Sequence, residues 1–121
     1  MYKNESSTFR VALASSDGGY TVDTHFGRAR EFFVYQYFDG EWVFVEKRTL
    51  EPVCRNGVHS SDEMLSSVAA FSDCQYVIAS RIGMGASSAM AQMGIVAMAL
   101  PGDLMEALDK IYSYHEIQNL F

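Results

Sequence analysis

The sequence predicts an α/β domain in which one mixed sheet of about five strands carries helices packed on its faces. Two observations lead to this class. The first half of the chain holds two runs rich in aromatic and β-branched residues, Phe32 to Phe38 and Trp42 to Leu50, joined by an Asp39-Gly40 pair that is typical of a hairpin turn. From Ser60 onwards the apolar pattern alternates between helical and strand spacing, which calls for parallel strands joined by right-handed crossovers.

The first strand is expected at Phe9 to Ala14, F-R-V-A-L-A, which is mostly apolar and ends in a cluster of turn-forming residues, Ser15 to Gly19. Tyr20 to Val22 fit a short returning strand. Together with the hairpin, these segments predict a meander of antiparallel strands in the first half of the chain.

A loop is expected over residues 51–59, which include a proline and a glycine. Ser60 with Glu63 fits a capping box, so Ser60 or Ser61 should cap a helix that ends near Ser72-Asp73. The apolar residues of this segment recur at helical spacing and predict one buried face.

Tyr76 to Ser80 is predicted to form a second buried strand. The turn from Arg81 to Gly85 then leads into a second helix, which runs through Ala91 and is closed by Gly94.

Ile95 to Leu100 is predicted to form a third apolar strand. Pro101-Gly102 ends that strand, and Asp103 is expected to cap the last helix because Glu106 follows three residues later. This helix should have about three turns or a little more, with Leu104 on its apolar face.

Length, composition and charge limit the domain number and the function. With 121 residues, 49% of them hydrophobic, we expect one domain at residues 9–121 after a flexible tail at residues 1–8. A protein with a net charge of -6 is poorly suited to neutralise the phosphates of a nucleic acid, so we expect no nucleic-acid partner.

The sequence shows no signal peptide and no apolar run near the ~20 residues of a membrane span, which predicts a cytoplasmic protein without a membrane partner. An exposed strand edge in the hairpin half would allow a homodimer.

Polar residues able to do chemistry are concentrated in residues 15–31, S-S-D-G-G-Y-T-V-D-T-H-F-G-R-A-R-E. Ligands of α/β sheets usually bind beyond the carboxyl ends of the parallel strands, where residues 15–18, 81–87 and 101–103 should converge into one polar rim. His25 is the strongest candidate, because imidazole is the commonest metal ligand and a general acid or base near neutral pH. The alternative role for His25 is to cap a helix or to hydrogen-bond the turn.

Several residues near His25 complete this candidate site. Arg28 and Arg30 add positive charge to an acidic protein. The Gly83 to Ser87 turn joins a strand to a helix, so its backbone N–H groups could hold an anion; the alternative is a tight turn that packs the helix on the sheet. Ser88 stands where a dinucleotide fingerprint needs its third glycine. The candidates for cofactor binding are therefore Ser16, His25, Arg28, Gly83, Met84 and Gly85.

The two cysteines, Cys54 and Cys74, are too few for one chain to assemble a zinc or cluster site from four thiolates. Cys54 has an arginine beside it and is, with His25, a candidate metal ligand. Cys74 precedes a buried strand and is expected to be a small core residue. For His59 and His115 we expect structural roles.

Three motifs resemble a known family: V-A-L-A-S-S-D-G at Val11 to Gly18, V-D-T-H-F-G-R-A at Val22 to Ala29, and G-M-G-A at Gly83 to Ala86. They are similar to the NifX, NafY and NifB C-terminal domain family, the dinitrogenase iron-molybdenum cofactor binding proteins, from Phe9 onwards. The resemblance implies a ribonuclease H-like fold and a non-enzymatic carrier of an iron-molybdenum cofactor or an iron-sulfur precursor cluster. It implies His25, in the H-F-G motif, as the cluster contact, and cluster-assembly or nitrogenase proteins as partners.

Other functions stay open beside this resemblance. The chain lacks the radical S-adenosylmethionine domain of NifB-type proteins and the extra N-terminal domain of NafY-type carriers, so we expect the binding module alone. A metal-dependent hydrolase with a ribonuclease H-like fold would use Asp17 and Asp103. A cofactor-free interaction module would instead regulate a partner enzyme.

Overall fold

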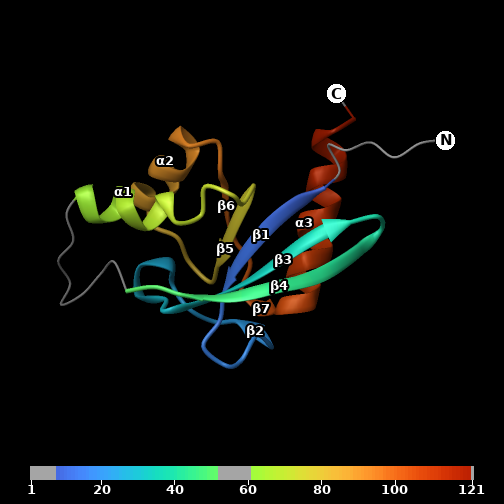
Figure 1. The fold of residues 1–121 in the computed structure, drawn as a ribbon, viewed down its shortest axis with the longest axis horizontal. Coiled ribbons are helices and arrows are strands. Elements are labelled where there is room, and N and C mark those ends of the chain that lie inside the picture. Colours follow the sequence, from blue (N-terminus) through green and yellow to red (C-terminus); the bar gives the residue numbers. More distant parts are fainter. Residues whose placement is uncertain (1–7, 52–60, 121) are drawn as a thin grey trace.

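The computed structural model describes residues 8–51 and 61–120. Within these residues the main sheet contains β1 (Phe9–Ala14), β3 (Glu31–Phe38), β4 (Glu41–Thr49), β5 (Tyr76–Ala79) and β6 (Val96–Ala99). The strand order is β4-β3-β1-β5-β6 (Figure 1). The strands β4, β3 and β1 pair antiparallel, whereas β1, β5 and β6 pair parallel. The mixed five-stranded sheet predicted from the sequence is confirmed.

Helices cover both faces of this sheet (Figure 1). The described helices are α1 (Ser61–Ala69), α2 (Met84–Gln92), α3 (Leu104–Gln118) and the short 3₁₀ helix η2 (Phe26–Arg28). Successive side chains of a strand point to opposite faces, so Ala12 and Ala14 of β1 join the core under α1 and α2. Val11 and Leu13 join the second core, under α3.

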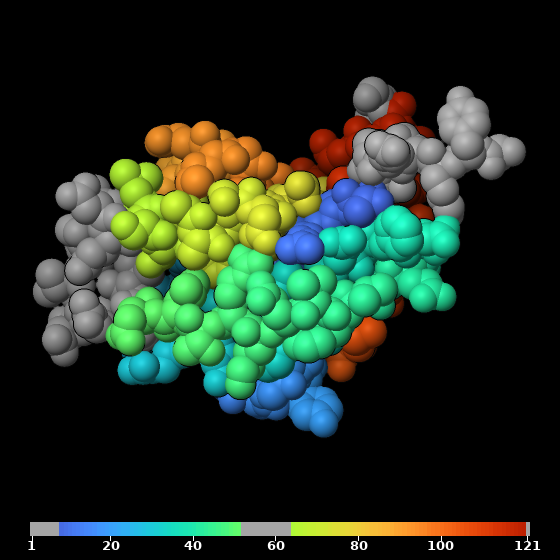
Figure 2. Space-filling view, in the orientation of Figure 1, coloured from blue at the N-terminus to red at the C-terminus, as the bar shows by residue number. Residues whose placement is uncertain are grey.

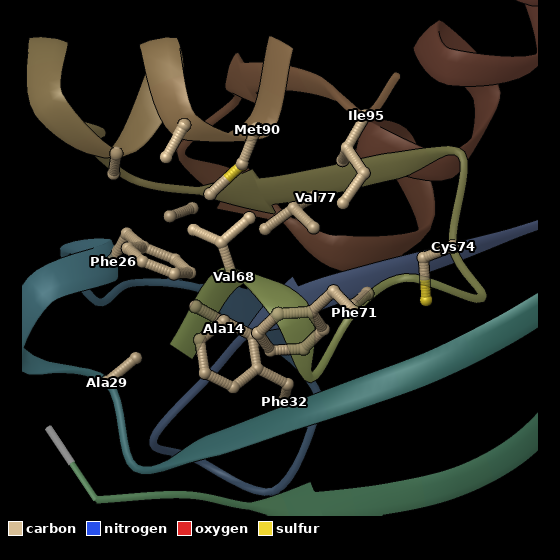
Figure 3. Packing of buried hydrophobic residues seen from close by; sticks show 14 of the residues in the cluster. Ala14, Phe26, Ala29, Phe32, Val68, Phe71, Cys74, Val77, Met90 and Ile95 are labelled. Atoms are coloured by element: carbon tan, nitrogen blue, oxygen red, sulfur yellow. The ribbon is translucent and has the colours of Figure 1, made fainter. Parts of the chain in front are cut away.

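The core under α1 and α2 is built around three aromatic rings (Figure 3). The ring centroids of Phe32 and Phe71 are 4.7 Å apart, and that of Phe26 lies 5.7 Å from Phe32. Met90 of α2 is fully buried in the same cluster. Burial of each of these side chains contributes about 1.5–3 kcal/mol, so this core fixes the positions of α1 and α2 on the sheet.

The core under α3 is centred on Phe9, whose ring contacts Tyr37, Trp42 and Tyr76. The His115 ring stacks on Phe9 at 3.8 Å, and its Nδ1 is 2.7 Å from the Tyr76 hydroxyl. His115 therefore has a structural role, as expected from the sequence. His59 lies outside the described residues.

The short strand β2 (Thr21–Val22) was expected to continue the antiparallel meander, but it pairs with β7 (Gly102–Asp103) in a separate two-stranded sheet. The φ angles of Gly18 and Gly19 are 87° and 91°, a left-handed conformation that glycine adopts without strain, and they turn the chain away from β1. A side chain at Gly19 would place its Cβ 3.1 Å from the Phe33 ring.

The ends of the helices differ partly from the prediction. α1 ends at Ala69, before the expected Ser72-Asp73, because a series of short-range turns follows it, in which Phe71 N–H donates to the Val68 carbonyl at 2.9 Å. α3 has 15 residues, longer than expected. Its predicted cap is confirmed, since the Asp103 carboxylate accepts from Glu106 N–H at 3.0 Å. The predicted Ser60 cap lies outside the described residues, and no helix within those residues has the length and apolar character of a membrane span.

Candidate functional site

The His25 loop is fastened to the carboxyl end of β5. Phe26 N–H donates to the Arg81 carbonyl at 2.9 Å, and Ser80 N–H donates to the Thr24 carbonyl at 3.0 Å. His25 and Arg81 thereby form an isolated parallel bridge. This pairing places the H-F-G motif beside the turn that leads into α2.

In the segment H-F-G-R-A, residues 25–29, two side chains are buried in the core and two are exposed to solvent. Phe26 and Ala29 are buried in the core under α1 and α2, where Figure 3 shows both side chains. His25 and Arg28 are exposed. The 3₁₀ turn η2 between them has Arg28 N–H donating to the His25 carbonyl at 3.0 Å. The buried Phe26 and Ala29 therefore fix the backbone that carries the exposed imidazole and guanidinium.

A cavity of about 390 Å³ opens between this loop and the start of α2. The lining comes from the His25 loop, from the turn at Gly83 to Ser87 (the glycine turn) with the preceding Arg81, and from one residue of α1. The lining residues are His25, Phe26, Gly27, Arg28, Met64, Arg81, Gly83, Met84, Gly85 and Ala86. Of the six cofactor-binding candidates, the cavity brings together His25, Arg28, Gly83, Met84 and Gly85.

The charges at this cavity are available to a ligand. Within the described residues, the side chains of His25, Arg28 and Arg81 have no hydrogen-bond or ion-pair partner in the protein. By contrast, Arg10 and Arg48 both pair with the Asp73 carboxylate. In a protein of net charge -6, an unpaired cationic lining favours an anionic ligand.

The glycine turn leaves the first N–H groups of α2 open. Gly83 is the N-cap, and no side chain caps the helix there. A Cβ at Gly83 would meet no atom within 4 Å, so the space above this turn is free for a ligand. The backbone N–H groups and the helix dipole at this end favour negative charge.

Two methionines add thioether sulfur to the lining. Met84 is 86% exposed, and Met64 of α1 is half-buried with its methyl group 3.9 Å from a Cβ built at Gly85. Met64 belongs to the apolar residues that were expected to form the buried face of this helix, and the sequence analysis missed its place at the cavity. Arg81 was expected in the polar rim as part of residues 81–87 but was not named as a binding candidate, and it also lines the cavity.

Ser16 lies apart from these residues, contrary to the prediction of a single rim. It lines a second cavity of about 280 Å³ with Ser15, Thr24, Arg28, Arg30 and Glu31. Residues 102–103 pair with β2 and line neither cavity. Arg28 is the residue that both cavities share. Cys54, the second predicted metal ligand, lies outside the described residues.

Asp17 and Asp103, the aspartates of the hydrolase hypothesis, have local partners, and so does the nearby Asp23. Asp17 accepts hydrogen bonds from the Thr21 hydroxyl at 2.6 Å and from Ser15 and two backbone N–H groups, and these bonds, led by Thr21, hold its pKa well below the ordinary range. Desolvation raises the pKa of Asp23, but hydrogen bonds from Ser16 and Thr24 outweigh it and the net shift is downward. Asp103 caps α3. The described residues contain no group of three or more His, Cys, Asp or Glu side chains placed to hold a metal ion.

Comparison with known proteins identifies relatives of the chain. Residues 8–114 match the family described as dinitrogenase iron-molybdenum cofactor. The chain is 34% identical to the FeMo cofactor biosynthesis protein NifB of Frankia alni over 83% of its length, and 32% identical to NifB of Sinorhizobium fredii over 86%. It spans only 19% and 21% of the length of these two relatives.

Solved structures share the fold. The NMR structure of a Thermotoga protein described as NifB, TM1290, aligns over 87% of this chain and 88% of its own, with a TM-score of 0.55 and 25% identity. The crystal structure of PH0822 aligns over 86% and 90%, with a TM-score of 0.59 and 22% identity. From the family match over residues 8–114 and the identity to the two NifB proteins, the chain belongs to the dinitrogenase iron-molybdenum cofactor family.

Proposed function

We propose that this chain acts in iron-molybdenum cofactor biosynthesis as a non-enzymatic carrier. Its cargo is the iron-molybdenum cofactor or an iron-sulfur precursor cluster, held transiently in the cavity between the His25 loop and α2. Membership of the family and similarity to two FeMo cofactor biosynthesis proteins, both NifB, support the pathway. The lining of the cavity supports the carrier role.

One observation carries this proposal. The His25 imidazole is exposed at a 390 Å³ cavity and has no partner among the described residues, although its backbone is fixed by the bridge to Arg81. A histidine that capped η2 or bonded the turn would use its ring, and no side-chain bond caps η2. An imidazole held in place with a free ring nitrogen can bind a metal.

The rest of the lining suits a sulfide-rich anionic cluster. Arg28 and Arg81 supply unpaired positive charge, and the open N–H groups of the Gly83 turn supply neutral donors. Met64 and Met84 present soft sulfur to a soft ligand. One imidazole with these weaker contacts makes a reversible site, which a carrier needs in order to release its cargo. Cluster-assembly or nitrogenase proteins are the partners that would give and receive it.

The strand order also supports a finer description of the fold. An antiparallel β4-β3-β1 unit followed by parallel β5 and β6 agrees with the ribonuclease H-like arrangement that the resemblance implied. The hydrolase alternative gains nothing from the site, because Asp17 and Asp103 are used by a turn and a helix cap. We therefore assign the fold a binding role.

The test is anaerobic incubation with isolated iron-molybdenum cofactor or its iron-sulfur precursor, followed by gel filtration and metal analysis. Wild-type protein should co-elute with iron. His25→Ala should bind about tenfold more weakly, as expected for the loss of one ligand bond. Lys110→Gln, an exposed change on α3 across the sheet, is the control and should bind like wild type.

Since His25 is exposed and its ring has no partner within the described residues, His25→Ala should keep the wild-type unfolding midpoint in urea. A stably folded His25→Ala protein that retains its iron would refute the role of His25. Failure of the wild type to bind either cluster would refute the carrier.

A cofactor-free interaction module is the second candidate, and one observation favours it. Figure 2 shows β4 crossing one face of the molecule uncovered, and Val43, Phe44 and Val45 of this edge strand are 49%, 50% and 37% exposed. Such an edge can accept a strand from a partner or from a second copy of the chain. Light scattering over a range of protein concentrations would detect a homodimer, and Val43→Lys should abolish one that uses β4.

A further inference from the structure

The second cavity lies beyond the carboxyl end of β1, and Arg28 separates it from the proposed cluster site. Its volume of about 280 Å³ is large enough for a small organic or inorganic anion. The carrier proposal uses Arg28 and none of the other residues described in the lining of this cavity.

The donors in this cavity are guanidinium groups. Ser16 and Thr24 already direct their hydroxyl protons to the Asp23 carboxylate, at 2.7 Å each, and the Ser15 hydroxyl donates to Asp17. Arg28 and Arg30 are exposed, and neither guanidinium has a partner among the described residues. A ligand in the cavity can therefore use two unpaired cations.

The acidic groups nearby do not cancel this charge. Asp23 is turned toward Ser16 and Thr24 and is not part of the lining. Glu31 is the one carboxylate among the lining residues that the structure describes, and its Oε2 lies 3.6 Å from Lys47 Nζ. The described lining therefore carries two unpaired cations and one carboxylate that has a partner.

We infer that this cavity binds a small oxyanion, a carboxylate or a tetrahedral oxyanion, through Arg28 and Arg30. Planar guanidinium groups match both kinds of anion with paired N–H donors. The binding needs no metallocluster, so the inference can be tested on metal-free protein and does not depend on the carrier function.

The two cavities provide matched variants, because Arg30 lines only the second and Arg81 only the first. Metal-free protein labelled with ¹⁵N is titrated with inorganic phosphate and, separately, with citrate, at constant ionic strength set by chloride. The amide signals of Ser16, Thr24 and Glu31 report on the second cavity. Those of Gly83 and Gly85 report on the first.

Saturable shifts are expected at the Ser16, Thr24 and Glu31 amides. Arg30→Gln should weaken binding about tenfold, the effect of one charged hydrogen-bonded pair, while Arg81→Gln should leave it unchanged. Glu31→Gln should tighten binding about threefold, because it removes a like charge. Saturation with citrate alone assigns a carboxylate ligand, and saturation with phosphate alone assigns a tetrahedral one.

Three results would overturn the inference. One is the absence of saturable shifts with either probe in wild-type protein. Another is a response centred on Gly83 and Gly85. The third is equal weakening by Arg30→Gln and Arg81→Gln, which would mean a general charge effect without a site. Both arginines are exposed and unpaired within the described residues, so the ¹⁵N spectra of both variants should keep the dispersion of the folded protein.

Discussion

Phe26 N–H donates a 2.9 Å hydrogen bond to the Arg81 carbonyl, while the Phe26 ring lies in the core beside Phe32, 5.7 Å away between centroids. The backbone of the His25 loop is thereby bonded to the residues that follow β5, and the Phe26 side chain packs against Phe32 of β3. His25 gains its position from its neighbour and needs no contact of its own ring. Stability and binding should therefore respond separately to mutations at these adjacent positions.

Phe26→Ala should lower the free energy of unfolding by about 3–5 kcal/mol, because it removes a buried ring from a packed aromatic cluster. Urea unfolding measures this loss. Phe26→Leu, which keeps most of the apolar volume, should cost much less. A Phe26→Ala protein as stable as wild type would show that the loop is not anchored in this way.

Asp103→Ala should lower the free energy of unfolding by about 1 kcal/mol, since it removes the carboxylate that caps α3 at Glu106 N–H. Asp103→Asn keeps an acceptor oxygen and is the control. Both variants keep the backbone pairing of β7 with β2. Equal stability of all three proteins in urea would contradict the capping role.

Stability should fall in acid through Asp73. The hydrogen bond from the Arg48 guanidinium lowers the pKa of Asp73 well below the ordinary 3.8, with Arg10 as a second partner. The folded state therefore binds this proton less tightly than the unfolded state. The stabilisation is complete above the ordinary pKa and is lost as the pH falls from there toward the folded-state pKa.

Urea midpoints between about pH 7 and about pH 2 test this effect. Asp73→Asn should be less stable than wild type near neutral pH, and its midpoint should fall less below about pH 4. Glu46→Gln removes a second carboxylate partner of Arg48, which is exposed, and should change the neutral midpoint less. Parallel pH curves for wild type and Asp73→Asn would contradict the linkage.

Cys74 should be unreactive in the folded protein. Burial is the main cause that raises the pKa of this thiol to about 12, helped by the adjacent Asp73 carboxylate. The thiolate is the reactive form, and very little of it is present at neutral pH. In a Cys54→Ala background, a thiol reagent should label Cys74 only after unfolding in urea. Rapid labelling without denaturant would show that the Cys74 site opens.

The sequence predicted the main sheet because its signals are local. Runs rich in aromatic and β-branched residues around Asp39-Gly40 are sufficient for a hairpin. β3 begins one residue before the predicted start and ends as predicted, and β4 is shifted by one residue at both ends. The Asp103 cap was also predictable, since a capping bond joins residues three apart. The H-F-G motif and the Gly83 to Ser87 turn were both predicted to contribute to a site, and residues of both line the 390 Å³ cavity.

Contacts between distant segments could not be read from such patterns. β2 and β7 have two residues each and pair across about 80 positions, and pairs this short leave no periodic signal. Met64 joins the cavity because α1 packs beside α2, and Ser16 is separated from Gly83 because Arg28 lies between two cavities.

Sequence alone was sufficient for the order of the main-sheet strands and the longer helices, and for the residue types available for binding, because these follow from local backbone preference and hydrophobic spacing. The tertiary structure decided which of those residues share a cavity and which charges have partners. Arg10 and Arg48 are neutralised by Asp73, whereas Arg28, Arg30 and Arg81 are unpaired within the described residues. That distinction depends on distances between segments far apart in the chain, which packing of the two cores sets.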